Sequence, residues 1–151
     1  MKYLFAFVFG FASLLSSAQS ANKNYDQALA QKLGADEYGM RGYVLGILKT
    51  GPVEIKDQKK MDVLFRGHME NINKMAESGK LVVAGPFNKN DQNYRGMYIF
   101  NVKNREEADA LLKNDPMLAE KVMVIEYFDW YGSAALPEYL PIHSKIEQKK
   151  H

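Results

Sequence analysis

Cysteine is missing from this 151-residue sequence, and so are long runs of one charge and apolar segments long enough to cross a membrane. Without cysteine there is no disulfide, thiolate nucleophile or cysteine-ligated metal. The 20 Lys and Arg residues balance 18 Asp and Glu residues, which argues against the basic face of a nucleic-acid binder. With 46% hydrophobic and 25% charged residues, the composition is globular and excludes wholesale disorder. At this length we expect one compact domain.

The first residues have the three parts of a secretory signal peptide. Lys2 precedes an uncharged apolar run at residues 3–15, and small residues follow it. A transmembrane helix needs about 20 apolar residues, so this run is too short to span a bilayer. We therefore expect a signal peptide at residues 1–21, cleaved after Ala18 or Ser20. The mature protein would be exported, to the periplasm or outside the cell, with no further membrane association.

After a leader at residues 22–39, with at most one marginal helix, strand and helix patterns alternate. Apolar residues spaced three, four and seven apart predict a helix at 57–78, and Asn104, with a glutamate three residues on, opens a shorter one. β-branched and aromatic runs predict strands at 40–48, 80–84, 97–102 and 121–131. The β-α-β-β-α-β order predicts an α+β, ferredoxin-like domain at 40–133, an antiparallel sheet with both helices on one face. We expect the polar tail at 134–151 to be poorly ordered.

Both faces of the predicted strands are apolar. In the third strand Met97 and Ile99 point to one side and Tyr98 and Phe100 to the other, and the pattern leaves open which set faces outward. Two helices cover only one face, so the other would expose a larger apolar patch than monomers usually carry. We therefore expect a homodimer that joins the open faces into a dimeric α/β barrel. Alternatively, the leader and the tail fold over the open face.

His68 falls on the core-facing side of the long predicted helix, four residues after Leu64 and four before Ile72. A buried imidazole needs a hydrogen-bond partner, so His68 is either a satisfied core residue or a base oriented by a second group. Asp115, which precedes Pro116, has the pattern of a helix N-cap. One carboxylate can cap a helix and also accept an imidazole N–H. We therefore predict His68 and Asp115 as the catalytic pair.

Three motifs follow one another along the chain: His68, the segment Gly79-Lys-Leu-Val-Val-Ala-Gly85-Pro86, and Asp115-Pro116. Together they resemble the YCII-related (YciI-like) family over about residues 40–131. The resemblance implies a ferredoxin-like dimeric α/β barrel with an active-site pair at His68 and Asp115. It also implies a relationship to muconolactone isomerases. One branch of the family is associated with the dehydrochlorination of chlorinated hydroxyquinols. The export signal, the leader and the tail depart from the family pattern.

We expect a pocket around this pair that binds a small aromatic or enol-bearing molecule. As an enzyme, the protein would be a lyase or isomerase without a cofactor, in which His68 removes a proton and Asp115 orients it. The alternative is a non-catalytic small-molecule-binding or accessory module. Gly85, Pro86 and His143 are weaker candidates for substrate binding, and Gly85 with Pro86 also fits a plain turn. No metal site is expected, because the usual ligand spacings are missing.

Overall fold

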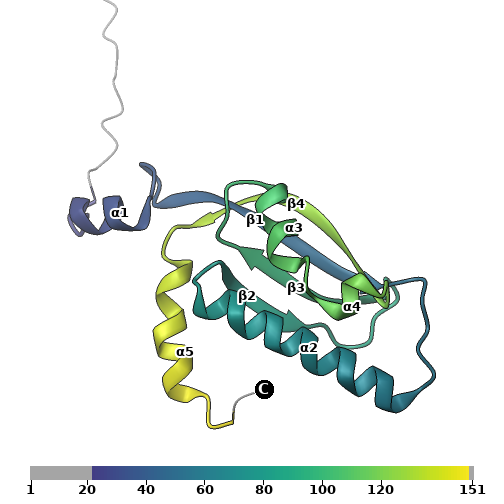
Figure 1. The fold of residues 1–151 in the computed structure, drawn as a ribbon. Coiled ribbons are helices and arrows are strands. Elements are labelled where there is room, and N and C mark those ends of the chain that lie inside the picture. Colours follow the sequence, from purple (N-terminus) through teal and green to yellow (C-terminus); the bar gives the residue numbers. More distant parts are fainter. Residues whose placement is uncertain (1–21, 150–151) are drawn as a thin grey trace, which may run out of the picture.

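The computed structural model describes residues 22–149, so the expected signal peptide lies outside the described residues. A four-stranded sheet carries its main helices on one face, and a further helix stands beside the edge strand (Figure 1). None of the helices in the described part is long and apolar enough to cross a membrane. The elements are α1 (Gln27–Leu33), β1 (Met40–Thr50), α2 (Gln58–Glu77), β2 (Leu81–Pro86), β3 (Tyr94–Phe100), α3 (Arg105–Leu112), α4 (Pro116–Ala119), β4 (Met123–Ser133), the 3-10 helix η1 (Leu136–Tyr139) and α5 (Leu140–Ile146).

The sheet has the strand order β2-β3-β1-β4, and all neighbouring strands are antiparallel. This is the predicted ferredoxin-like arrangement. The fourth strand begins two residues later than predicted, because Lys121 has a φ of 55° and turns the chain out of α4. It also runs further than predicted, to Ser133, which pairs with Met40 at the start of β1. The β-branched and aromatic residues predict that this strand exists, whereas the turn at Lys121 and the pairing with β1 determine where it begins and ends.

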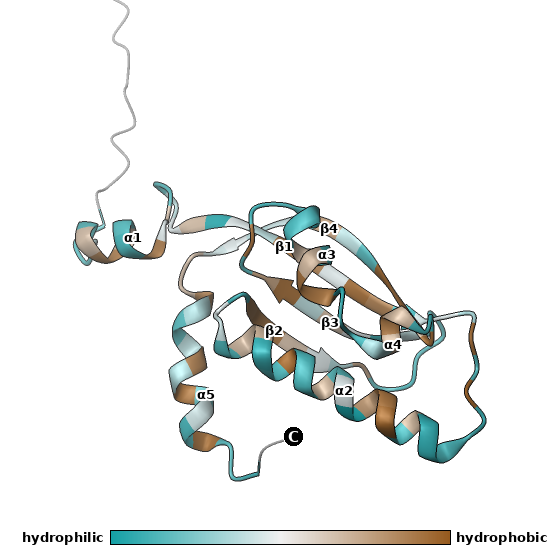
Figure 2. Ribbon diagram, viewed as in Figure 1, coloured by the Kyte–Doolittle hydropathy of each residue, from teal (hydrophilic) through white to brown (hydrophobic). Residues whose placement is uncertain are grey.

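The main core lies between the sheet and α2 and α3. Tyr98 and Phe100 are 1% and 0% exposed within this core, so they face the helices. Met97 and Ile99 therefore lie on the open face of the sheet, which answers the question that the alternation left undecided. Figure 2 shows hydrophobic residues along the central strands and an alternation of hydrophilic and hydrophobic residues along α2.

The tail differs from the sequence-based prediction of a poorly ordered segment. It forms η1 and α5, because apolar and hydroxyl groups near its start contact the sheet. Leu136 packs against the cluster of Tyr43, Val82 and Ile99, and the Tyr139 hydroxyl donates a hydrogen bond to the Val82 carbonyl. The tail thus covers one end of the open face. The leader helix α1 buries none of its residues and does not cover this face.

Much of the open face remains uncovered. Val124 and Phe128 are exposed large hydrophobic side chains on β4, and Leu45 and Phe128 are paired across β1 and β4. Ile47 and Met97 are paired across β1 and β3 and extend the same apolar surface. We propose that a second copy of the chain covers it, because exposed patches of this kind mark interaction sites.

The dimer is tested by a charge in this surface. We expect the wild type to scatter light as a dimer and Phe128→Glu as a monomer, because an unpaired charge buried in an interface costs several kcal/mol. Val63→Glu is the matched control, since Val63 is also an exposed apolar residue but lies on α2, on the helix side of the sheet. A wild-type monomer at micromolar concentration, or a Phe128→Glu variant that stays dimeric, would contradict the proposal.

Candidate functional site

Helix α2 places His68 in the interior. Asp57 caps its start by accepting hydrogen bonds from the Lys59 and Lys60 backbone N–H groups, and Gly79 follows its end with a φ of 70°. The buried side chains of α2 form one stripe, in which His68 lies four residues after Leu64. His68 is 5% exposed, so its ring depends on protein partners for its hydrogen bonds.

Asp115 is the partner of His68. Its Oδ1 accepts the Met117 backbone N–H at 3.0 Å, which caps α4, and Pro116 occupies the first turn of that helix. Its Oδ2 lies 2.7 Å from His68 Nδ1. The carboxyl group is 0% exposed. The structure therefore brings the two predicted residues together, and Asp115 both caps a helix and orients the imidazole.

The contact requires α2 and α4 to approach closely at Gly67, the residue before His68. A Cβ atom at Gly67 would lie 2.8 Å from Pro116 Cγ, closer than real Cβ contacts. Because glycine has no Cβ, the first turn of α4 can lie against α2 and bring Asp115 within reach of the imidazole. The close approach of Gly67 and Pro116 thus helps to position the pair.

Tyr98 is a third member of the site that the sequence analysis did not identify. Its hydroxyl lies 3.4 Å from His68 Nε2, a long hydrogen bond, and the two rings are stacked with centroids 6.5 Å apart. Burial, and then the charge of Asp115, raises the pKa of Tyr98 well above its ordinary value, so the phenol stays protonated at neutral pH. A buried tyrosine hydroxyl needs a polar partner, which is the signal that could have linked it to His68.

With Asp115 in its ionised form, the two contacts of the imidazole predict where its proton lies. An ionised Asp115 only accepts hydrogen bonds, so His68 Nδ1 carries the proton that is donated to it. In the neutral ring Nε2 then has a lone pair, and the Tyr98 hydroxyl donates to it. In this tautomer Nε2 carries the lone pair, and the contact of Nδ1 with Asp115 on the other side of the ring favours it.

The weaker candidates lie elsewhere. Gly85 and Pro86 pair with Met97 and Gly96 in the ladder between β2 and β3, so they extend a strand instead of forming the turn considered above. His143 is exposed on α5, where its ring meets that of Tyr139 at 6.5 Å. None of the hydrogen bonds or ring contacts of His68 in the described part of the chain involves these residues.

We searched the described residues for side chains that could together hold a metal ion. Within residues 22–149, no group of three or more histidines and carboxylates could hold a metal ion. His68 and Asp115 use one ring nitrogen and both carboxylate oxygens in their contacts with each other and with α4.

A comparison with protein families agrees with this architecture. The model of the YCII-related domain matches residues 44–131, more than half of the chain and nearly all of the sheet and its helices. The chain therefore belongs to the YCII-related family. The matched region contains both members of the His68–Asp115 pair. A search of curated proteins found no significant match.

A comparison of two N-cap variants separates the capping role of Asp115 from its contact with His68. Loss of an N-cap alone costs about 0.5–2 kcal/mol, and a buried imidazole left without a partner costs about 1–3 kcal/mol more. We therefore expect Asp115→Ala to lower the free energy of unfolding by more than Asn104→Ala does. Asn104 is the matched control, because it caps α3 through the Glu107 N–H at 2.9 Å but is exposed. Equal losses in urea titrations would show that the contact with His68 adds nothing.

Proposed function

We propose that this protein is an exported, dimeric enzyme that removes a proton from a small aromatic or enol-bearing carbon acid at His68, as a cofactor-free lyase or isomerase. The observation that carries the proposal is the buried contact of 2.7 Å between His68 Nδ1 and Asp115 Oδ2. Kinship of the YCII-related family with muconolactone isomerases supports the reaction class. Export is supported by the signal-like pattern of residues 1–21 alone.

The proton transfer follows from the tautomer. His68 Nε2 takes the proton from a carbon beside a carbonyl group, the C–H bond breaks, and its electron pair delocalises onto the carbonyl oxygen to give an enolate. The resulting imidazolium lies against the Asp115 carboxylate, which stabilises the new positive charge. In an isomerase the proton returns to another carbon, whereas in a lyase the electron pair expels a leaving group such as chloride.

The substrate reaches Nε2 only after a movement, because His68 is 5% exposed and Tyr98 occupies the free side of its ring. The Phe65 ring lies one turn earlier on α2, with its centroid 6.2 Å from that of the imidazole, and it is itself exposed. Movement of Phe65 or rotation of Tyr98 would open the site. Since burial keeps Tyr98 protonated, its hydroxyl can then donate a hydrogen bond to the substrate oxygen that gains charge.

A specific observation favours a second candidate, a non-catalytic binding or accessory module. In the closed arrangement no buried side-chain nitrogen or oxygen of the described residues lacks a hydrogen-bond partner. His68, Asp115 and Tyr98 thus also form a fully satisfied polar core, which needs no substrate to explain it. Turnover distinguishes the two candidates.

The experiment measures proton transfer by the mature protein. Incorporation of solvent deuterium into a muconolactone and chloride release from a chlorinated hydroxyquinol are followed by NMR and ion chromatography. We expect His68→Gln to lower a detected rate about 10²–10⁴-fold, the usual contribution of a general base. Asp115→Asn should also lower it, because an amide can donate to Nδ1 and so favours the tautomer with its proton on Nε2.

The double variant tests whether His68 and Asp115 act together in the reaction. If the two residues act as one unit, His68→Gln combined with Asp115→Asn is little slower than His68→Gln alone. Melting curves confirm that each variant is folded, and Asn caps a helix about as well as Asp. Full activity in His68→Gln, or a wild type that neither exchanges protons of the muconolactone nor releases chloride from the hydroxyquinol, would leave the accessory-module function as the better account.

A further inference from the structure

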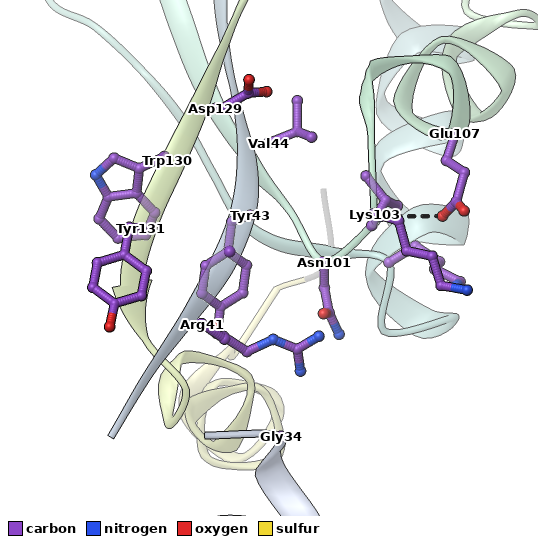
Figure 3. Close-up of a pocket in the computed structure, with 13 residues that line it drawn as sticks. Gly34, Arg41, Tyr43, Val44, Asn101, Lys103, Glu107, Asp129, Trp130 and Tyr131 are labelled. Carbon is purple, nitrogen blue, oxygen red and sulfur yellow. Dashed lines mark hydrogen bonds between the residues drawn. The ribbon is translucent and has the colours of Figure 1, made fainter. Parts of the chain in front are cut away.

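A separate hollow of about 740 Å³ opens at the end of the sheet where β1 begins and β4 ends (Figure 3). Its lining comes from both of these strands, from Gly34 after α1, from Lys80 before β2, from the loop that follows β3 and from Glu107 of α3. Neither His68 nor Asp115 lines it. Tyr98 and Asn101 are three residues apart, which is about 10 Å along an extended strand. The hollow is therefore distinct from the buried pair.

Arg41 is held so that it faces this hollow. One terminal nitrogen donates to the Leu33 carbonyl at 3.1 Å, and the guanidinium carbon lies 5.5 Å from the centroid of the Tyr43 ring. These contacts leave other N–H donors of the guanidinium available to a ligand. In Figure 3 the guanidinium of Arg41 and the side-chain amide of Asn101 point toward the same space.

Two more cations line the same space. In the described part of the chain, the ammonium groups of Lys80 and Lys103 make no ion pair. The three cations Arg41, Lys80 and Lys103 outnumber the two carboxylates of the lining, and one of these, Asp129, lies 3.7 Å from Arg105, which is outside the lining. The hollow thus has an excess of positive charge.

One wall is aromatic. The rings of Tyr43 and Trp130 are neighbours across β1 and β4, with centroids 5.8 Å apart and planes inclined by 43°. Tyr43 is buried and its hydroxyl donates to the Ser133 carbonyl at 2.8 Å, so this wall is fixed in place. Because Tyr43 is only 3% exposed, the surface open to a flat apolar group is the half-buried Trp130 ring that Tyr43 supports, and the charge of such a group would meet Arg41.

From the juxtaposition of these cations with the aromatic wall, we propose that the hollow binds a small organic anion with a flat apolar body, of the aromatic carboxylate class. A guanidinium fork matches the two oxygens of a carboxylate, which favours this anion over a neutral aromatic. The site goes beyond the proposed function, because neither its position nor its chemistry involves His68.

Trp130 provides the test, since it is the only tryptophan of the chain and lines the hollow. Benzoate is titrated against the full-length mature protein at a concentration where light scattering has established the oligomeric state. We expect a saturable change in Trp130 fluorescence, together with amide shifts around residues 41–44 and 101–103 in NMR spectra. Benzamide, a neutral molecule of nearly the same shape, should bind at least about tenfold more weakly.

Charge variants locate the site. We expect Arg41→Gln to weaken benzoate about tenfold, which is about 1.4 kcal/mol. Lys103→Gln should weaken it about threefold, and because the Lys103 side chain holds nothing in place, this variant does not disturb the fold. Lys113→Gln is the matched control, since it removes the same charge from an exposed residue outside the hollow.

The proposal would be overturned by equal binding of benzamide and benzoate, by amide shifts confined to other parts of the chain, or by benzoate affinities of both Arg41→Gln and Lys103→Gln that equal that of Lys113→Gln. A linear, non-saturable response at millimolar benzoate would also overturn it. His68→Gln should keep the wild-type affinity for benzoate. Loss of binding in that variant would contradict the separation of the two sites, whereas loss of catalysis alone would leave the hollow unaffected.

Discussion

The hydrogen bond between His68 and Asp115 is the interaction on which the arrangement of the helices around the site depends. It joins the middle of α2 to the N-cap of α4 across 47 residues of sequence. Three local features must agree for it to form: the phase of the apolar stripe on α2, the N-cap of α4 and the missing side chain at Gly67. Because both groups are buried, neither can exchange its partner for water, and the contact is expensive to lose.

The same burial determines the chemistry that the pair can perform. An isolated charge in this interior would be strongly unfavourable, but a carboxylate that receives a backbone N–H and an imidazole N–H is compensated. Tyr98 completes the network from the sheet, and its raised pKa keeps a proton beside Nε2. The three groups therefore form a line from a helix cap to a strand, with one basic nitrogen in the middle.

Sequence patterns predicted the strand order and the positions of His68 and Asp115, because periodicity and capping are local properties of the chain. The alternation of β3 did not reveal which face the helices cover, and Tyr98 was missed because only packing brings its hydroxyl to His68. The ordered tail was missed because Leu136 and Tyr139 find their partners on a distant strand. Local patterns carry no information on such contacts until the sheet has formed.

The most direct test of this account is the position of the imidazole proton in the wild-type protein. Nitrogen-15 NMR of labelled histidine distinguishes the two neutral tautomers, and His68→Gln identifies which signals belong to His68. We predict a proton on Nδ1, donated to Asp115, and a lone pair on Nε2 that accepts from Tyr98. A neutral His68 with its proton on Nε2 would contradict the account, because the nitrogen that is meant to act as the base would then be occupied.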